Sequence, residues 1–258
     1  MKRLLFVFVF AAFVLMSCAT VYAGEGWGLN FEVKGEQPRG NKSAEYLAQY
    51  GAFYVGAGED KIIYLTFDAG YENDLTAGIL DVLKAHEVPA AFFLVGTYIR
   101  DWPDLIRRMV DEGHTVANHS MSHPDMTKLG RDAFLKEIEK VEDIYRGVTG
   151  QEIPRFYRPP RGIYDEATLK LTNELGYSTV FWSLAYRDWE NDNQPTQAQA
   201  FEKLIPRIHP GAIILLHNTS KTNAVILDEL LTKYKDLGYR FAGLDELAKR
   251  RNLQDLGA

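Results

Sequence analysis

The sequence predicts an α/β domain in which parallel strands alternate with helices. Three observations support this prediction: from residue 61 short apolar runs alternate with longer amphipathic stretches, no linker interrupts them, and polar residues recur where the runs end. Such alternation gives parallel strands joined by helical crossovers, and about seven such units are enough to close into a barrel. In these folds ligands bind beyond the carboxyl ends of the strands. The recurring polar residues therefore predict an active site at one rim of the sheet.

Each expected strand is a short run with β-branched and aromatic content, and each expected helix is an amphipathic stretch between two such runs. The strands are expected near residues 61–67, 90–95, 114–118, 155–158, 178–183, 212–216 and 239–242. The helices are expected near residues 74–86, 103–112, 131–149, 165–175, 197–208, 222–237 and 243–251. Residues 24–60 contain eight glycines without a regular period, and we interpret them as an irregular arm that leads into one domain, residues 61–250.

The first 23 residues are typical of a signal peptide. Met1-Lys2-Arg3 is a basic start, Leu4–Met16 is an apolar run, and Val21-Tyr22-Ala23 resembles a small-residue cleavage site. The apolar run of 13 residues is shorter than the ~20 that span a bilayer. We therefore expect export, with a retained anchor as the alternative. Cys18 also lies in a loose lipoprotein box, so lipid anchoring through this residue is a second alternative.

Composition argues against several classes of function. The formal net charge is −6, and cleavage of the leader would leave 27 basic against 35 acidic residues, a net charge of −8. Such a chain is unsuited to nucleic acid. The only cysteine lies in the leader and no Gly-x-Ser-x-Gly elbow occurs, so cysteine and serine nucleophiles are not expected. We expect a monomer with neither a nucleic acid partner nor a nucleotide cofactor.

Asp68 and His217 each follow a predicted strand. Asp68 ends the run of residues 61–67, and Gly70 after it permits a sharp turn or the close approach of a ligand. A carboxylate there suits a metal ligand or a general base, with a helix N-cap or a turn residue as the alternative. His217 ends its apolar run in the same way, whereas Glu72 is interpreted as an ordinary solvated residue.

His119 and His123 are the most specific local signal, because two imidazoles so closely spaced are able to bind one metal ion. Pro124 disfavours the α conformation at His123, so we expect a turn after the 114–118 strand rather than a regular helix. A chance pair on the surface or in the core is the alternative. Polar residues at the ends of other predicted strands argue against it.

Arg158 and Arg161 lie in the segment Arg158-Pro-Pro-Arg-Gly162, which is stiff because both prolines fix φ. The segment is able to hold two guanidinium groups and the nearby backbone N–H groups in place. A Pro-rich connection with solvated arginines is the alternative. The residues by themselves do not decide between the two interpretations.

Five motifs containing these residues resemble, in the same order, those of the polysaccharide deacetylases with a NodB-homology domain, carbohydrate esterase family 4. The motifs are Thr66–Gly70, His119–His123, Arg158–Gly162, Asp188–Trp189 and Leu215–His217. The resemblance covers roughly residues 60–250 and is closest to the delta-lactam-biosynthetic de-N-acetylases, which act on muramic acid in peptidoglycan. It implies a distorted (β/α) barrel of NodB-homology type, with residues 61–250 as the catalytic domain.

The resemblance also implies a catalytic role for each matched residue. Asp68 resembles the general base that deprotonates the attacking water, and Arg158 resembles the arginine that pairs with this base. His217 resembles the general acid that protonates the leaving amine. Asp188 resembles the carboxylate that keeps the imidazole charged.

His119 and His123 resemble the metal ligands of the family, but a third ligand is missing. Many members have a second aspartate where this chain has Ala69, and alanine cannot coordinate a metal. We therefore expect weak binding of a divalent ion, zinc in the first place, with manganese, magnesium or cobalt as alternatives. Ala185 is a second departure, since an aspartate often lies three residues before Asp188. Losses of this kind favour the alternative of a domain that only binds glycan.

Four further residues are expected to contact the substrate. Leu215 resembles the residue that lines the pocket for the acetyl methyl group, and the backbone N–H of Arg161 matches the oxyanion donor of the family. The Arg161 side chain alternatively pairs with the lactyl carboxylate of muramic acid. Tyr186 and Trp189, together with Trp182, form either a platform for a sugar ring or ordinary packing at the rim.

Amide hydrolysis needs an activated water, a polarised carbonyl and a proton for the amine, and these motifs supply each of them. We therefore predict an exported, metal-dependent hydrolase that removes the N-acetyl group from N-acetylmuramic acid in peptidoglycan, leading to muramic delta-lactam. Its place is the cell wall or the spore envelope. The alternatives are deacetylation of N-acetylglucosamine in peptidoglycan or chitin, and a non-catalytic glycan-binding module.

Overall fold

The computed structural model describes residues 24–256, with side chains described as far as residue 251. The predicted signal peptide of residues 1–23, which contains Cys18, lies outside the described residues. Within the described part of the chain, no helix is both long and apolar enough to cross a membrane.

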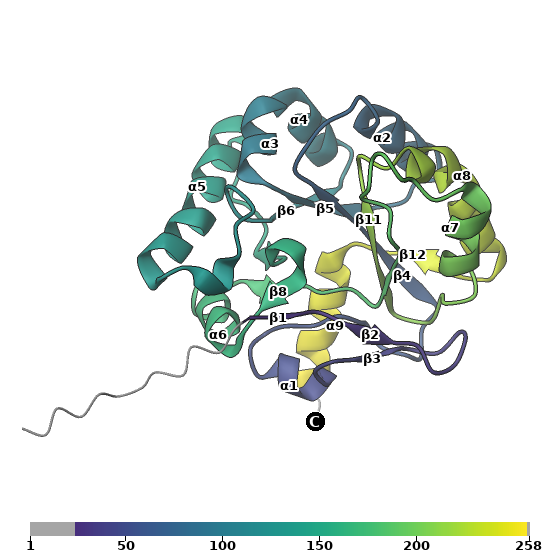
Figure 1. Cartoon of the computed structure of the whole chain (residues 1–258), viewed down its shortest axis with the longest axis horizontal. Coiled ribbons are helices and arrows are strands. Elements are labelled where there is room, and N and C mark those ends of the chain that lie inside the picture. The colour runs from purple at the N-terminus through teal and green to yellow at the C-terminus, as the bar shows by residue number, and fades with distance from the viewer. Residues whose placement is uncertain (1–23, 257–258) are drawn as a thin grey trace, which may run out of the picture.

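A curled sheet of parallel strands forms the centre of the fold (Figure 1). Neighbouring strands follow the order β10, β11, β4, β5, β6, β7 and β9, and β12 also pairs with β4. Their bounds are β4 (Ile62–Ala69), β5 (Ala90–Leu94), β6 (Thr115–Asn118), β7 (Phe156–Tyr157), β9 (Ser178–Thr179), β10 (Leu184–Ala185), β11 (Ala212–His217) and β12 (Arg240–Phe241). The predicted α/β fold, a distorted (β/α) barrel, is confirmed.

The strand expected at residues 178–183 is interrupted. The run at residues 178–183 forms a strand only over Ser178–Thr179, and β10 begins after it. Between the two strands, the Phe181 N–H donates to the carbonyl of Phe53, a residue of the N-terminal arm. The chain therefore leaves the sheet at this point because its backbone pairs with the arm.

The two faces of the sheet have different cores. All eight residues of β4 are buried, as expected of a parallel strand covered on both sides. Leu65 faces the outer helices in the main core, whereas Tyr64 and Phe93 belong to a second core inside the curl. Successive side chains of a strand point to opposite faces. Thr66 and Asp68 therefore lie on the inner side with Tyr64.

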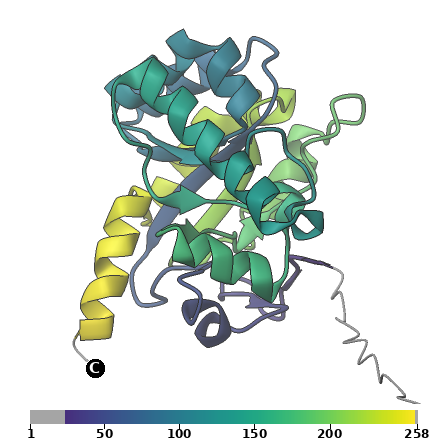
Figure 2. The same cartoon turned by 90° about the vertical axis from the view of Figure 1, so that its left-hand side faces the viewer.

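Helices cover the outer face of the sheet (Figures 1 and 2). They are α2 (Thr76–Ala85), α3 (Gly96–Asp101), α4 (Pro103–Asp111), α5 (Arg131–Thr149), α6 (Glu166–Glu174), α7 (Gln197–Leu204) and α8 (Lys221–Asp236). The domain also contains α9 (Leu244–Leu256) and short 3₁₀ turns at Met126–Lys128 and Pro160–Gly162. Leu244 and Leu247 of α9 pack into the inner core beside Ile62, at the start of β4. This helix therefore closes the inner core at the end opposite the carboxyl rim.

The N-terminal arm is more regular than expected. It contains β1 (Glu25–Gly26), β2 (Leu29–Asn30), β3 (Arg39–Gly40) and α1 (Ala44–Ala48), and β1 pairs with β8 (Ile163–Tyr164). Trp27 and Leu47 are buried in a third apolar cluster with Tyr164 and Phe181. The rest of the arm lies outside helices and strands, and apolar residues between its glycines pack onto the segment that follows β7.

Candidate active site

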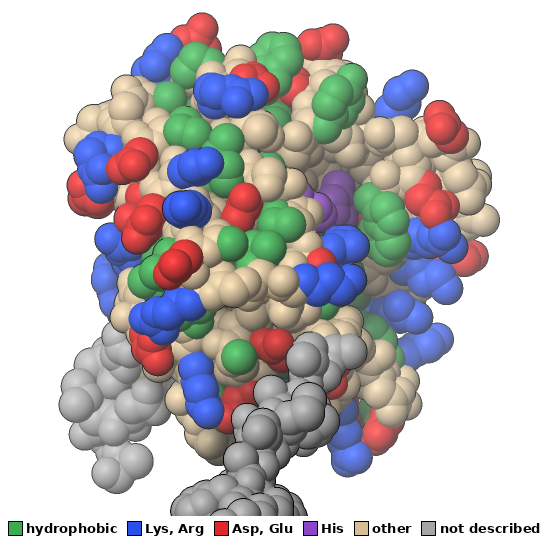
Figure 3. Space-filling model, turned by 60° about the vertical axis from the view of Figure 1, so that its left-hand side comes forward, with side chains coloured by type: hydrophobic (Ala, Val, Ile, Leu, Met, Phe, Trp, Pro, Cys, Tyr) green, Lys and Arg blue, Asp and Glu red, His purple; other side chains and the backbone are tan. Residues whose placement is uncertain are grey.

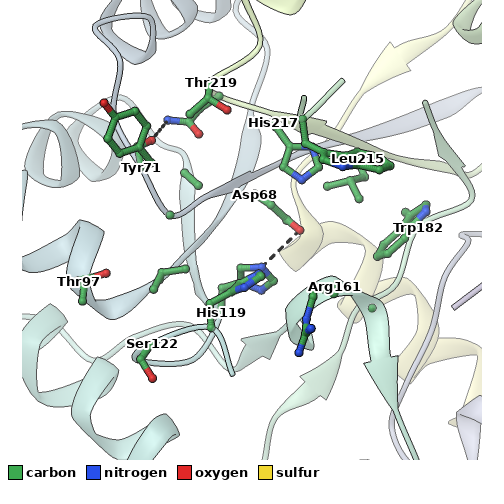
Figure 4. Close-up of a pocket in the computed structure, with 17 residues that line it drawn as sticks. Asp68, Tyr71, Thr97, His119, Ser122, Arg161, Trp182, Leu215, His217 and Thr219 are labelled. Atoms are coloured by element: carbon green, nitrogen blue, oxygen red, sulfur yellow. Dashed lines mark hydrogen bonds and ion pairs between the residues drawn. The ribbon is translucent and has the colours of Figure 1, made fainter. Parts of the chain in front are cut away.

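The register of two neighbouring strands brings Asp68 and His217 together. Asp68 of β4 and His217 of β11 are paired residues at the carboxyl ends of these parallel strands. Their side chains extend into the same space (Figure 4). The two residues are 149 positions apart in the chain, and the sheet makes them neighbours.

A cavity of about 620 Å³ opens at this rim. Its size lies within the range of ligand-binding pockets. Figure 3 shows histidine side chains inside a hollow of this face, with hydrophobic side chains beside them. Seven of the ten predicted site residues line the cavity: Asp68, His119, His123, Arg161, Trp189, Leu215 and His217.

Arg158 lies inside the barrel and holds Asp68. It is fully buried, and its Nη1 donates to Asp68 Oδ1 at 2.6 Å and to Thr66 Oγ1 at 2.9 Å. Its Nε donates to the carbonyl of Val180 at 3.0 Å, and its guanidinium lies 4.0 Å from the centre of the Phe93 ring. The alternative of a solvated arginine is therefore wrong for Arg158.

Asp68 is held as a carboxylate although it is buried. Burial raises the pKa of Asp68, but the positive charge of Arg158, with contributions from His119 and His217, outweighs this effect and lowers the pKa below its ordinary value. The Asp68 carboxyl therefore stays ionised at neutral pH. A buried anion held beside a cavity in this way is suited to accept a proton.

The two histidines meet in a turn, as the sequence predicts. Ser120 and His123 have φ of 66° and 59°, and the His123 N–H donates to Ser120 Oγ. The turn brings the His119 and His123 rings to a centroid distance of 4.9 Å. Left-handed conformations are uncommon outside glycine and concentrate at functional sites.

His119 presents its second ring nitrogen to the cavity. The contact between Nδ1 and the Arg158 carbonyl at 2.7 Å assigns the proton to Nδ1, because a carbonyl only accepts. Nε2 is then a free acceptor, 3.6 Å from Asp68 Oδ2. Burial lowers the pKa of His119 to about 4, and burial also lowers the pKa of His123. Both imidazoles are therefore neutral at neutral pH.

His217 is paired with Asp188 on the opposite side of the cavity from His119. Asp188 is fully buried, and its Oδ1 accepts from His217 Nδ1 at 2.8 Å while its Oδ2 accepts from the His217 backbone N–H at 2.8 Å. Burial lowers the pKa of His217, but the charge and hydrogen bond of Asp188 outweigh it and raise the pKa above the ordinary value. The imidazolium form is therefore favoured, as a proton donor requires.

The predicted substrate residues divide into two groups. Arg161, Leu215 and Trp189 line the cavity together with Trp182. Arg161 has φ of 57° and forms no ion pair with any described residue, and the Trp189 ring lies 5.8 Å from that of His217. Tyr186 does not line the cavity: it is buried, and its hydroxyl donates to Asn223 Oδ1.

The structure places at the site residues to which the sequence assigned no role there. Asn223 donates to Asp188 Oδ2 at 2.6 Å, and Tyr71 is an exposed aromatic residue at the edge of the cavity. Glu72 is buried and accepts hydrogen bonds from Tyr98 and Thr76, so its interpretation as a solvated residue is wrong. Thr76 is close in the chain, but Tyr98 lies 26 residues away, and local charge patterns do not reveal such a partner.

Comparison with known proteins identifies the family. A family model described as polysaccharide deacetylase matches residues 56–180. The peptidoglycan-N-acetylmuramic acid deacetylase PdaA of Bacillus subtilis is 44% identical over 230 residues, which are 88% of this chain and 87% of PdaA. The chain belongs to the polysaccharide deacetylase family.

Structural similarity supports the same assignment. The solved structure of PdaA, a family 4 carbohydrate esterase, matches this polysaccharide deacetylase with a TM-score of 0.85 and 43% identity, over 88% of this chain and 98% of the other. A peptidoglycan-N-acetylglucosamine deacetylase of Bacillus cereus is 32% identical over 206 residues, 78% of this chain and 74% of that protein. The match to PdaA therefore extends over more of the chain and at higher identity.

Polysaccharide deacetylases of this family generally require a metal ion. Among the described residues, no group of three or more His, Cys, Asp or Glu side chains is placed to hold one. Ala69 lines the cavity where an aspartate would be a third ligand. The donor set still fits a weakly held divalent ion, because His119 and His123 are adjacent, neutral and at the cavity, and the free Nε2 of His119 faces Asp68.

Proposed function

We propose that this polysaccharide deacetylase hydrolyses the N-acetyl group of N-acetylmuramic acid in peptidoglycan. The observation that carries the proposal is the pairing of Asp68 with Arg158 and of His217 with Asp188 at one rim of the barrel. One pair favours a proton acceptor and the other a proton donor, which is the division of labour that amide hydrolysis needs. The 44% identity to a deacetylase named for this sugar supports the choice of substrate.

Two protons move in the proposed reaction. Asp68 takes a proton from the attacking water as the new C–O bond forms at the acetyl carbon. His217 gives its proton to the amide nitrogen as the C–N bond breaks, so that acetate and a free amine leave. Asp188 holds the imidazolium through Nδ1, which leaves Nε2 of His217 to donate.

The remaining residues orient the acetyl group. The backbone N–H of Arg161, at the edge of the cavity, donates to the oxygen that becomes negative in the transition state. Leu215 provides an apolar contact for the acetyl methyl group. His119 and His123 would hold a divalent ion, which would supply polarisation of the carbonyl and a lower pKa for the attacking water.

An arginine side chain without an ion-pair partner among the described residues also supports the choice of muramic acid. The lactyl group distinguishes muramic acid from glucosamine by a carboxylate, and Arg161 has no ion-pair partner among the described residues. Trp182 and Trp189 offer faces on which the sugar ring stacks. Deacetylation leaves an amine and a lactyl carboxyl group on one sugar, and loss of water between them closes the delta-lactam.

The proposed location follows from the substrate. Peptidoglycan lies outside the cytoplasmic membrane, and the leader of residues 1–23 provides the expected route of export. The enzyme is then placed at the cell wall or the spore envelope, released by cleavage after Ala23 or anchored by lipid at Cys18.

A direct test compares two glycans. Purified protein is incubated with peptidoglycan strands that contain N-acetylmuramic acid and with chitin oligosaccharides, with and without a chelator, and acetate and product masses are measured. We expect acetate from the first substrate, a new amine or lactam on muramic acid, and loss of both with the chelator. Activity that is unchanged by the chelator would contradict the metal assignment.

The same experiment separates the alternatives. An amine that appears on glucosamine indicates an N-acetylglucosamine deacetylase, the second candidate, which the relative from Bacillus cereus supports. Binding to glycan without any acetate release indicates a non-catalytic module. Asp68→Asn serves as the control, since a reaction that needs no base at this position contradicts the proposed mechanism.

A further inference from the structure

Asp188 is held by a third hydrogen bond that comes from outside the His217 pair. Asn223, in the first turn of α8, donates its Nδ2 to Asp188 Oδ2 at 2.6 Å and to the carbonyl of His217 at 3.2 Å. Asn223 is buried. Its amide therefore contacts both members of the pair that is proposed to protonate the amine.

The orientation of this amide is itself fixed. The hydroxyl of Tyr186 donates to Asn223 Oδ1, so the oxygen of the amide faces Tyr186 and the nitrogen faces Asp188. The opposite orientation would place the amide oxygen against a carboxylate, and neither group is able to donate to the other. The Asp188 carboxylate and the His217 carbonyl, which only accept, thus select the orientation of the amide, and the tyrosine hydroxyl supports it by donating to the amide oxygen.

We propose that Asn223 is a positioning residue for His217: it holds the Asp188 carboxylate in the orientation that the imidazole requires, and the hydroxyl of Tyr186 holds the oxygen of its amide in place. The inference rests on the proposed role of His217 as the proton donor. It also gives Tyr186, which does not line the cavity, a role at the site that involves no contact with substrate.

The physical argument concerns rotation of a buried carboxylate. Three donors hold Asp188: His217 Nδ1 on Oδ1, and the His217 N–H and Asn223 Nδ2 on Oδ2. Without Asn223, one side of Oδ2 loses its donor in a site closed to water, and the carboxylate turns more freely about its Cβ–Cγ bond. The alignment of Oδ1 with Nδ1 is then populated less, and small losses of alignment are costly in catalysis.

The first test measures His217 without any substrate. The charged groups that face His217 are Asp188, Asp68 and Arg158, and His123 lies near enough to interact; Asn223→Leu changes none of them. NMR titration of the imidazole, assigned by the loss of its signal in a His217→Asn variant, gives the pKa directly. We expect this pKa to fall in Asn223→Leu, and to fall by less in Tyr186→Phe.

The second test measures turnover. We expect kcat for acetate release to fall on the order of tenfold in Asn223→Leu with KM unchanged, because orientation rather than binding is lost. Tyr234→Phe is the matched control: the Tyr234 hydroxyl is also buried and donates to the Leu204 carbonyl at 3.1 Å, far along α8 from the cavity. This control should leave both the His217 pKa and kcat unchanged.

The outcomes separate a positioning role from a structural one. If Asn223→Leu does not fold, Tyr186→Phe, which removes one oxygen atom, decides the question. A lower melting temperature with an unchanged His217 pKa in Tyr186→Phe would show that the hydrogen bonds of Tyr186 and Asn223 serve only stability. This result would overturn the inference. A rise in the His217 pKa would overturn the inference too. It would show that Asn223 acts only by weakening the electrostatic effect of the Asp188 carboxylate on His217. If the wild type releases no acetate, the proposed function fails, and the NMR titration still tests the inference.

Discussion

Arg158 and Asp68 form an ion pair inside the barrel: the arginine is fully buried, and its Nη1 lies 2.6 Å from Asp68 Oδ1. A buried ion pair gives little net stability, but removal of one partner leaves the other charge without compensation. The pair therefore links the ionisation of Asp68, the proposed base, to the stability of the folded barrel. Its structural and catalytic contributions are separable by measuring unfolding and turnover in the same variant.

Replacement of Asp68 by asparagine should affect both properties. We expect kcat to fall by about 10²–10⁴ because the base is lost. We expect the free energy of unfolding to fall by roughly 3–5 kcal/mol because Arg158 keeps a buried charge. Acetate release and urea unfolding measure the two effects. Asp74→Asn is the control, since Asp74 is exposed and its φ of 67° suits asparagine.

The pH dependence of turnover should be bell-shaped. Asp68 must be ionised, and its lowered pKa places the acidic limb below the ordinary aspartate value of ~3.9. His217 must be protonated, and its pKa is raised, so activity is lost as the pH rises through a value above the ordinary ~6.5. In Asp188→Asn the basic limb should move to lower pH. An unmoved limb in that variant would exclude Asp188 as the cause.

Restoring an acidic residue at position 69 should strengthen metal binding. Ala69 lines the cavity beside the two histidines and offers no ligand. We expect Ala69→Asp to tighten Zn²⁺ binding by about 10–100-fold in calorimetry, since a charged oxygen ligand joins two neutral nitrogen ligands. Ala69→Asn, similar in size but without the charge, is the control. Equal affinities in wild type and Ala69→Asp would place the ion elsewhere.

Glu72 should contribute to stability in a pH-dependent way. Its carboxylate accepts from Tyr98 and Thr76 at 2.5 Å each and from the Thr76 and Asn73 N–H groups. Burial raises the pKa of Glu72, but these hydrogen bonds outweigh it and lower the pKa. The stabilisation is therefore present above the unfolded pKa of ~4.3 and is lost as the pH falls through the lower folded value.

Glu72→Gln measures this contribution. Glutamine keeps one acceptor oxygen and replaces the other with a donor, so the Tyr98 and Thr76 hydroxyls compete for one atom. We expect a loss of about 1–3 kcal/mol in the free energy of unfolding at neutral pH. The difference from wild type should shrink in strongly acidic urea titrations. A difference that is constant with pH would show that ionised Glu72 is not the cause.

Tyr71 should contribute to binding of long glycans. Its side chain is 65% exposed, it lines the cavity, and its carbonyl accepts from Asn218 Nδ2 at 2.9 Å. An exposed aromatic residue held in this way is suited to stack on a sugar beside the one that reacts. We expect Tyr71→Ala to raise KM several-fold for oligosaccharides, with kcat unchanged. Trp102→Ala, an exposed aromatic residue that does not line the cavity, should leave KM unchanged.

The sequence predicted the elements well because their signals are local. The apolar run before Asp68 contains the entire β4 pattern, and Gly150 ends α5 in a left-handed conformation, as a glycine at that place predicts. The prediction for Glu72 was wrong, and the packing of the arm was not foreseen, for the opposite reason. Burial of Trp27 and Glu72 depends on segments more than twenty residues away, such as Phe181 and Tyr98.

The sequence by itself determined the chemistry available to this protein: the residue types, their places at the ends of strands, and the absence of a ligand at Ala69. Only the tertiary structure decided how they combine. Strand register pairs Asp68 with His217, and the charges of Arg158 and Asp188 outweigh the effect of burial on the pKa of each residue. The tertiary structure also shows that Tyr186 lies outside the cavity, where its hydroxyl donates to Asn223. The physical reason is that the sequence gives the order of residue types along the chain, whereas burial and hydrogen-bond partners arise only when distant segments pack together.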